Sequence, residues 1–433
     1  MRVACDSLVA LGDATSDGSV LFAKNSDRPA LECQPLVLLA AAAHAVGSRV
    51  RCQYIEIPQV ETTLRILGSR PFWLWGLEHG VNEAGVAIGN HTVFTRDNPE
   101  GRKLIGMDLV RLGLERGATA RAAVDVICAL VERHGQGGSG YRDSDFPYHS
   151  SFLVADRAEA FLLETSDRFW ALKKVAAVGS ATNHVTIGRD WDSLSPDTVA
   201  HAVAEGWWSG AESEFDFAAA YRDSSWVPPS FSSGRYRRTC EILESERGRI
   251  DEATLRRALR DHYDGPVFRG TYPPDDERYL SVCMHADPVG ATTAAAVVRI
   301  PSNEKPIRYW ASLGPPCVGV FLPLYVIAEL PPLLTFGSAD PDARSLWWAF
   351  RRLLELVEKD RERRAPLVRS RWDRIEAEIV DEAERLEGEI ARRADPRYPD
   401  DPFLAARLAA FTEKCVVRAS GGVAEIAAEL ESQ

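Results

Sequence analysis

The chain has 433 residues, of which 45% are hydrophobic and 26% charged, as in a globular protein that buries a substantial core. This length allows two or three domains, although a single enzyme domain can absorb much of it. The net charge of −12 argues against a nucleic-acid scaffold, which is usually basic. The apolar run at residues 36–46 is too short to cross a bilayer, and the first residues lack the apolar segment of a signal peptide. We therefore expect a cytoplasmic protein with neither nucleic-acid nor membrane partners.

The eight cysteines and nine histidines form no familiar metal-binding pattern. There is no CxxC pair, no HExxH and no histidine-rich tract, so we expect no metal and no cofactor. In a reducing compartment most cysteines behave as small buried hydrophobes. Cys283 and Cys317 are interpreted in this way, as structural residues.

The first half of the chain alternates between strand and helix patterns. Cys5 begins a short apolar strand, DATSDGS has turn chemistry, and VLFAKNSD resumes the strand pattern, which together predict a hairpin. Residues 50–60 resemble one further strand, and residues 80–94 a pair of strands that turns at Asn82-Glu83-Ala84-Gly85. Helices are predicted within residues 105–117 and 118–138 by their apolar spacing.

The second half predicts more strands and then a helical tail. Residues 151–173 alternate as antiparallel strands do, a helix is expected to begin at Ser195-Pro196, and residues 292–313 form another hairpin. From about residue 340 the pattern predicts a pair of amphipathic helices interrupted at Pro366. This order predicts an α+β fold rather than a parallel βαβ sheet. We divide the chain into a short propeptide (1–4), a main domain (5–335) and a helical C-terminal extension (340–433).

Cys5 has three competing interpretations: a buried strand residue, a lipid attachment site, or a nucleophile exposed by removal of four residues. The missing apolar leader argues against lipid attachment. A cysteine needs a base, and the signatures of papain-like enzymes and caspases are absent. Another established base is the α-amine of the nucleophile itself, which titrates at about 7.7–8.0. This solution requires cleavage before Cys5, and self-cleavage by its thiol is the economical route.

A series of collinear segments supports the catalytic interpretation. CDSLVALGDATSDGSVLFAKNSDRP, WGLEHGVNEAGVAIGN, SSFLVADRAEAFLLET, ATNHVTIG and SVCMHADPVGATTAAAVV closely resemble the secernin and dipeptidase group of N-terminal-nucleophile hydrolases. The resemblance covers roughly residues 5–330. It implies a four-layer αββα sandwich and a catalytic N-terminal cysteine that hydrolyses amide bonds of small peptides or N-acyl amino acids.

The resemblance also implies roles for individual residues. Cys5 matches the nucleophile, and Lys24 and Asp27 in KNSD match the [RK]-N-x-D element that orients its amine and thiol. Asn90 and Asn183 resemble the amides that polarise the carbonyl and stabilise the oxyanion. Arg235 resembles the active-site arginine, which pairs with Asp27 or holds a substrate carboxylate. His91 departs from the pattern, because secernins usually have glutamate there.

Three functions remain open on sequence alone. The leading hypothesis is a cysteine amidohydrolase, most simply a dipeptidase acting through a Cys5 thioester. An acyltransferase on the same fold would differ only in which nucleophile resolves that thioester. A catalytically silent, secernin-like binding or regulatory protein would use the helical tail for interactions. The amphipathic tail is also compatible with a homo-oligomer.

Overall fold

The computed structural model describes residues 4–225, 230–263, 276, 278–286, 290–302, 305–393 and 402–432. Its core contains two large antiparallel sheets. The first has the order β14-β1-β2-β17-β18-β19, with β16 also paired to β17. Its strands are β1 (Cys5–Ala10), β2 (Val20–Arg28), β14 (Val178–Ala181), β16 (His285–Ala286), β17 (Gly290–Ile300), β18 (Arg308–Leu313) and β19 (Leu322–Tyr325).

The second sheet has eight strands in the order β15-β13-β12-β11-β10-β9-β8-β3. They are β3 (Leu36–Leu39), β8 (Ile66–Ser69), β9 (His79–Asn82), β10 (Ala87–Val93), β11 (His149–Ala155), β12 (Ala160–Ser166), β13 (Phe169–Lys174) and β15 (Ser193–Leu194). Two small ribbons extend from it: β4 (Ala42–Ala43) with β7 (Thr62–Thr63), and β5 (Arg49–Arg51) with β6 (Glu56–Pro58).

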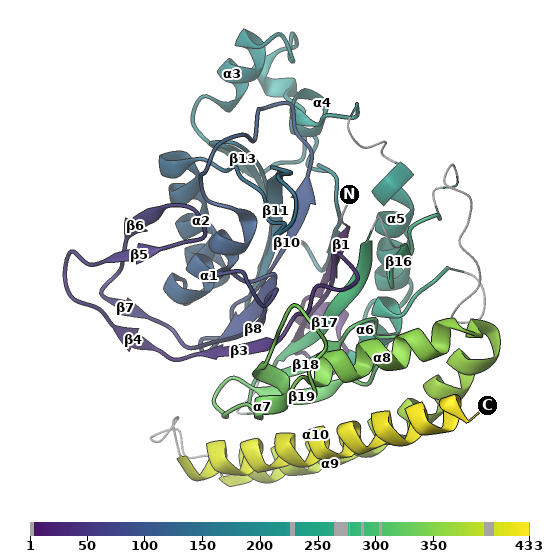
Figure 1. The fold of residues 1–433 in the computed structure, drawn as a ribbon. Coiled ribbons are helices and arrows are strands. Elements are labelled where there is room, and N and C mark those ends of the chain that lie inside the picture. Colours follow the sequence, from purple (N-terminus) through teal and green to yellow (C-terminus); the bar gives the residue numbers. More distant parts are fainter. Residues whose placement is uncertain are drawn as a thin grey trace.

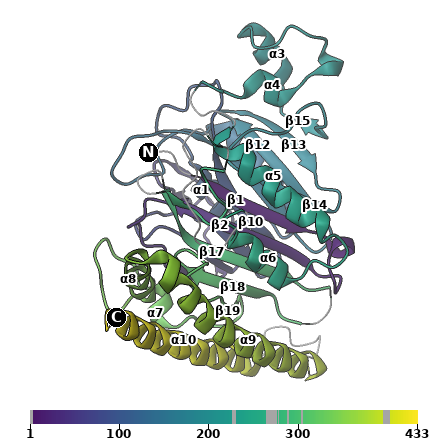
Figure 2. The same ribbon diagram turned by 90° about the vertical axis from the view of Figure 1, so that its right-hand side faces the viewer.

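The two sheets pack face to face, and helices cover their outer faces (Figures 1 and 2). Helices α1 (Gly106–Arg116) and α2 (Ala120–His134) lie on the second sheet, whereas α5 (Ser230–Ser245) and α6 (Glu252–Leu259) lie on the first. Because each sheet then buries both faces, nearly all their long strands are buried throughout. The fold is therefore α+β with four αββα layers, as the sequence predicted. Three short helices complete this part: α3 (Thr198–Ala204), α4 (Phe217–Tyr221) and α7 (Pro332–Thr335).

Most predicted elements of this part are confirmed, including the hairpins at residues 5–28 and 80–94 and both early helices. Two predictions are wrong in detail. Residues 50–60 form the two strands β5 and β6 instead of one, because the chain turns back between them. Helix α3 begins at Thr198, not at Ser195-Pro196, because the hydroxyl and backbone of Ser195 are used in a turn with Thr198 and Trp170.

The C-terminal extension contains three helices, not the predicted pair: α8 (Leu346–Glu358), α9 (Arg361–Arg393) and α10 (Pro402–Glu431). The prediction that Pro366 interrupts the helix is also wrong, since Pro366 lies inside α9. Near the start of a helix a proline removes a single hydrogen bond. The break falls instead at Lys359 and Asp360, where an Asp360 carboxylate oxygen accepts a hydrogen bond from the Arg363 amide and helps to start the new helix. Within the described part of the chain, no helix combines the length and apolar character needed to cross a membrane.

Buried charges join the extension to the first sheet. Arg308 of β18 is fully buried and forms ion pairs with Glu252 of α6 and with Glu384 and Glu387 of α9. Glu387 is equally buried and also accepts a hydrogen bond from the Tyr325 hydroxyl at 2.8 Å. The apolar residues of α8, α9 and α10 belong to the same hydrophobic cluster as those of β1, β2 and β17. The extension thus packs on the main body as part of one continuous core (Figure 2).

We expect Arg308→Ala to lower the free energy of unfolding by about 3–5 kcal/mol, because it removes the nearest counter-charge of the fully buried Glu387 and leaves only Arg299, at 3.5 Å. Chemical denaturation measures this change. Arg352→Ala is the matched control, since the Arg352–Glu431 pair is exposed and an exposed pair contributes about 0–1 kcal/mol. Equal effects of the two variants would contradict the role assigned to the buried network.

Candidate active site

Cys5 is the first residue of β1, and its surroundings follow from the register of the hairpin. Cys5 lies opposite Ser26 and Asp6 opposite Asn25 on β2. Because successive strand residues point to opposite faces, Cys5, Lys24 and Ser26 share the face toward the second sheet. Asp6, Asn25 and Asp27 share the face toward the helices. The same register, continued by one residue, places Asp27 opposite Ala4, the residue before Cys5. Asp27 therefore lies beside the Ala4–Cys5 peptide bond.

The inner face places one buried cation between the sheets. Lys24 is fully buried, and its ammonium group donates to the backbone oxygen of Asn90 on β10 at 2.7 Å. Next to it, His91 bonds the hydroxyl of Ser7 at 2.7 Å and lies 3.3 Å from that of Ser151. Burial and the charge of Lys24 hold the pKa of His91 well below its usual value, so its imidazole is neutral. His91 thus ties β1 to the second sheet.

The outer face carries an ion pair that reaches the nitrogen of Cys5. Arg235 of α5 pairs with Asp6 at 2.6 Å, and both side chains are fully buried. The same guanidinium donates to the side-chain oxygen of Asn183 at 2.9 Å, and that oxygen also accepts from the backbone nitrogen of Cys5 at 2.6 Å. The amide nitrogen of Asn183 donates to the Thr92 carbonyl at 2.9 Å. Asn183 is therefore fixed from both sides, with its side-chain oxygen bonded to the backbone nitrogen of Cys5.

Asp27 lies next to this ion pair but does not form it. The sequence offered Asp27 as the partner of Arg235, and this pairing is wrong: Arg235 pairs with Asp6. One carboxylate oxygen of Asp27 accepts from the hydroxyl of Thr292 on β17 at 2.6 Å. Among the described residues, none hydrogen-bonds the other oxygen. Burial and the neighbouring Asp6 raise the pKa of Asp27 well above its usual value, with Arg235 opposing them.

The thiol of Cys5 is not activated by its surroundings alone. Burial raises the pKa of the Cys5 thiol to about 11, although the charge of Lys24 and a hydrogen bond from the Asp27 backbone act in the opposite direction. At neutral pH such a thiol is protonated and weakly nucleophilic. A catalytic role would therefore require a base, and none of the described histidines hydrogen-bonds the sulfur.

Asn90 reaches the site from the opposite sheet. The orientation of its amide that satisfies the surrounding groups has the nitrogen donating to the Glu78 carboxylate and backbone oxygen, both at 2.9 Å. Glu78 is itself buried and pairs with Arg28 at 3.2 Å. The hydrogen-bond donors of Asn90 are thus engaged by Glu78 in this state.

Ala4, the residue before Cys5, fills a small apolar space. It is fully buried and belongs to a separate hydrophobic cluster; the other members are Leu280, Met284 and Ala286, with Phe231 and Tyr279 packed against them. Cys5 itself is only 4% exposed. A cavity of about 320 Å³ lies at the end of β10, lined by residues 93–100 and 145–149 with Asp223, and Cys5 is not part of its wall.

The structure brings all six predicted site residues together around the start of β1, on both faces of the first sheet, and none of them is on the surface. They are Cys5, Lys24, Asp27, Asn90, Asn183 and Arg235. Asn82 is a turn residue, as expected: its side chain bonds the Leu114 and Gly117 carbonyls. Sequence reasoning missed Asp6, Glu78 and Thr292. Asp6 follows Cys5 directly, which was the available signal, whereas Glu78 and Thr292 are found only from their contacts. Of the predicted propeptide, residues 1–3 are outside the described residues.

Comparison with known proteins gives distant curated relatives and several similar folds. No family model matches the chain. A probable dipeptidase of Salmonella dublin is 23% identical over 372 residues, which covers 75% of this chain and 81% of that protein. This relative agrees with the group that the sequence resembles.

Two solved structures are similar at 12% identity. A mutant conjugated bile acid hydrolase of Clostridium perfringens has a TM-score of 0.40 and aligns with 71% of this chain and 89% of its own. The Caenorhabditis elegans orthologue of N-acylethanolamine-hydrolyzing acid amidase has a TM-score of 0.36, with 68% and 92% covered. The αββα assignment itself depends on the strand order and helix packing described above.

Asp27→Asn is expected to stabilise the protein by about 1–2 kcal/mol at neutral pH. The raised pKa means that the folded state holds the Asp27 proton to higher pH than the unfolded state, so this group makes the free energy of unfolding fall as pH rises above about 3.9. Chemical denaturation between pH 4 and 8 measures both effects. Asp125→Asn, on the surface of α2, is the control and should change neither the free energy of unfolding nor its dependence on pH. A destabilised variant with an unaltered pH slope would show that the carboxylate is stabilised by its surroundings.

Proposed function

We propose that this protein is an amide hydrolase in which Cys5, once it is the first residue, attacks the carbonyl of a small peptide or N-acyl amino acid. The observation that carries the proposal is the hydrogen bond from the backbone nitrogen of Cys5 to Asn183, itself fixed by Arg235. This hydrogen bond goes to a side chain and so does not pair Cys5 with a neighbouring strand. It would, however, orient a free amine at Cys5. The Salmonella relative, a probable dipeptidase, supports the same reaction class.

The free amine would supply the base that the site otherwise lacks. An α-amine titrates at about 7.7–8.0 and can exchange a proton with the thiol of its own residue near neutral pH. Lys24 would stabilise the resulting thiolate, since its charge lowers the pKa of the Cys5 thiol. Asp27 is level with the Ala4–Cys5 bond, and no described residue hydrogen-bonds its second oxygen. It would hold the amine after cleavage.

The cycle then follows from these positions. The thiolate attacks the carbonyl, the amine transfers a proton to the leaving nitrogen, and water hydrolyses the thioester by the reverse path. Asn183 is assigned to the amine, because its oxygen accepts from Cys5 and its nitrogen is bonded to Thr92. Asn90 remains the candidate donor to the oxyanion. For that role one of its hydrogens must leave Glu78 when substrate arrives.

Self-cleavage and substrate hydrolysis would use the same space. In the precursor the carbonyl attacked by Cys5 belongs to Ala4, so Ala4 marks the position of the substrate residue that becomes the acyl group. Its side chain contacts an apolar cluster that includes Leu280 and Met284. The acyl residue of the preferred substrate is therefore expected to be small and uncharged.

Replacing the nucleophile tests the mechanism. We expect Cys5→Ala to lose hydrolysis at least about a thousandfold and to retain residues 1–4, because both cleavages need the thiol. Intact mass and amide hydrolysis measure the two outcomes on one sample. The control is Cys33→Ser, which changes a buried cysteine hydrogen-bonded to Ser345. This variant should keep both self-cleavage and amide hydrolysis. An active wild-type protein that still carries its initiator methionine would rule out the proposed base.

The acyl-side preference is tested with dipeptides that differ only in the first residue. We expect kcat/KM to be about 10–200-fold higher for an alanine or glycine first residue than for aspartate or tryptophan, the range that one apolar pocket can discriminate. Adding an amino acid amide as competing nucleophile separates hydrolysis from acyl transfer by the products formed. Faster cleavage of the charged or bulky substrates would contradict the position assigned to Ala4.

A further inference from the structure

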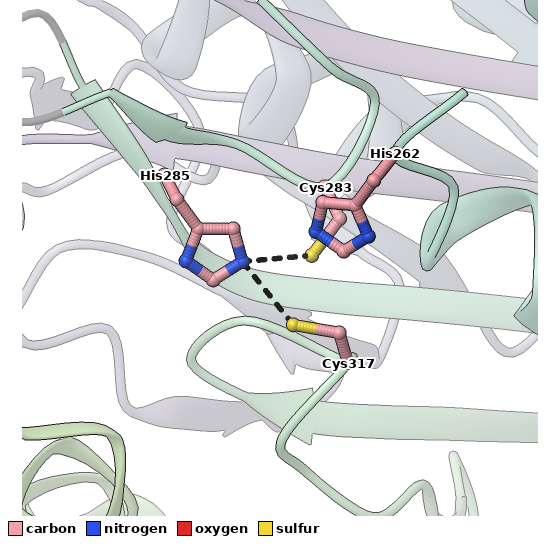
Figure 3. A group of neighbouring side chains, drawn as sticks. All are labelled: His262, Cys283, His285 and Cys317. Carbon is pink, nitrogen blue, oxygen red and sulfur yellow. Dashed lines mark hydrogen bonds between the residues drawn. The ribbon is translucent and has the colours of Figure 1, made fainter. Parts of the chain in front are cut away.

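Four metal-ligating side chains converge at a point that the proposed reaction does not use. They are His262, just after α6; Cys283 and His285, which precede and begin β16; and Cys317, in the connection between β18 and β19 (Figure 3). One ligand atom from each of the four lies within 4.8 Å of the others. Both cysteines are fully buried, and both histidines are partly buried. Three separate parts of the chain therefore direct nitrogen and sulfur atoms to one small volume.

The spacing of these atoms fits a tetrahedral ion. With zinc–sulfur and zinc–nitrogen bonds of about 2.3 and 2.1 Å, a tetrahedral site has sulfur–sulfur and nitrogen–sulfur separations of about 3.8 and 3.6 Å. The Nε2 atom of His285 lies 3.2 Å from the sulfur of Cys317 and 3.5 Å from that of Cys283 (Figure 3). The ring of His262 lies 5.3 Å from that of His285, centroid to centroid. The donors are thus already close to the edges of a coordination tetrahedron.

The chemistry of the set also selects the ion. Two thiolates and two neutral imidazoles are ligands that favour zinc among the divalent metals of proteins, and two thiolates neutralise its charge in a buried position. The other nitrogen of His285 faces the Glu358 carboxylate of α8 at 3.8 Å. A carboxylate behind a ligating histidine is a common second layer of zinc sites, where it orients the ring.

We propose that His262, Cys283, His285 and Cys317 form a structural zinc site. All four positions are taken by protein ligands, which is the arrangement of sites that stabilise a fold and leave no coordination position for a substrate. No metal is expected from the sequence, because neither Cys283-x-His285 nor the distant His262 and Cys317 forms a CxxC-type pattern. The proposal is independent of the proposed hydrolase activity.

The site would fasten β16 beside the candidate active site. Met284, between two of the ligands, donates from its backbone to the hydroxyl of Thr292 at 2.9 Å and accepts from the Thr292 backbone at 3.1 Å. The same hydroxyl donates to Asp27. Met284 also contributes to the apolar cluster around Ala4. Loss of the metal would therefore loosen Thr292 and the Ala4 space without removing any group assigned to the reaction.

Metal analysis of the full-length protein tests this directly. Protein purified under reducing conditions without chelators, equilibrated with Zn²⁺ and then desalted, should retain about one zinc per chain. Substitution with Co²⁺ should give the strong visible d–d absorption of a tetrahedral site and the near-ultraviolet band of sulfur-to-cobalt charge transfer. The alkylation of Cys283 and Cys317 should become fast only after a chelator is added.

Variants assign the ligands. Cys283→Ser, Cys317→Ser and His285→Gln should each weaken Zn²⁺ binding at least about 100-fold and lower the melting temperature. Cys415→Ser, a buried cysteine in α10, is the matched control and should keep the metal. The cobalt spectrum and alkylation of the wild-type protein decide the question even if a ligand variant does not fold.

Three results would overturn the proposal. The first is wild-type protein that retains no zinc after this treatment, and the second is a cobalt spectrum without sulfur-to-metal bands. The third is a Cys283–Cys317 disulfide in the native protein, seen as a mass lower by two hydrogens, which would make the pair a redox element instead.

Discussion

The antiparallel pairing of β1 with β2 is the constraint on which the site depends. It places Cys5 opposite Ser26, so that alternation along the strands directs Cys5 and Lys24 to the interior between the sheets and Asp6 to the helix side. A shift of β1 by one residue relative to β2 would exchange these faces and separate the Cys5 thiol from the ammonium group of Lys24. The neighbouring strands β14 and β17 fix the register on both sides, and through them Asn183 and Thr292 arrive at the nitrogen of Cys5 and at Asp27.

The site is unusual for its concentration of buried charge. Lys24, Asp6, Asp27 and Arg235 are all excluded from solvent, and only the Asp6–Arg235 pair is a direct ion pair. Burying charged groups is unfavourable unless each finds a partner. Asp27, whose second oxygen no described residue hydrogen-bonds, is therefore a destabilising feature that the rest of the fold has to offset. Features of this kind are expected where a group is held ready for a reaction.

The rest of the molecule supports this arrangement at a distance. The three C-terminal helices continue the hydrophobic core of the first sheet, and Arg308 connects β18 to α9 through the fully buried carboxylate of Glu387. On the other side, His262, Cys283, His285 and Cys317 gather the ends of α6, β16 and β18 next to β17. The buried Arg308 network holds the strands beyond β2, and the proposed zinc site would do the same beside β17, which carries Thr292.

The sequence by itself determined the α+β class, the hairpin at the beginning of the chain and the group of residues around Cys5, because these depend on local periodicity, turn chemistry and a series of collinear segments. It did not determine that α9 continues through Pro366 or that α3 begins after Pro196, because hydrogen bonds at Asp360 and Ser195 set where these two helices start. Nor did it reveal that Arg235 pairs with Asp6, that Glu78 engages Asn90, or that two histidines and two cysteines converge. Each of these contacts joins residues brought together by packing of separate strands and helices, and neither spacing nor composition along the chain records such distances. Tertiary structure alone decided them.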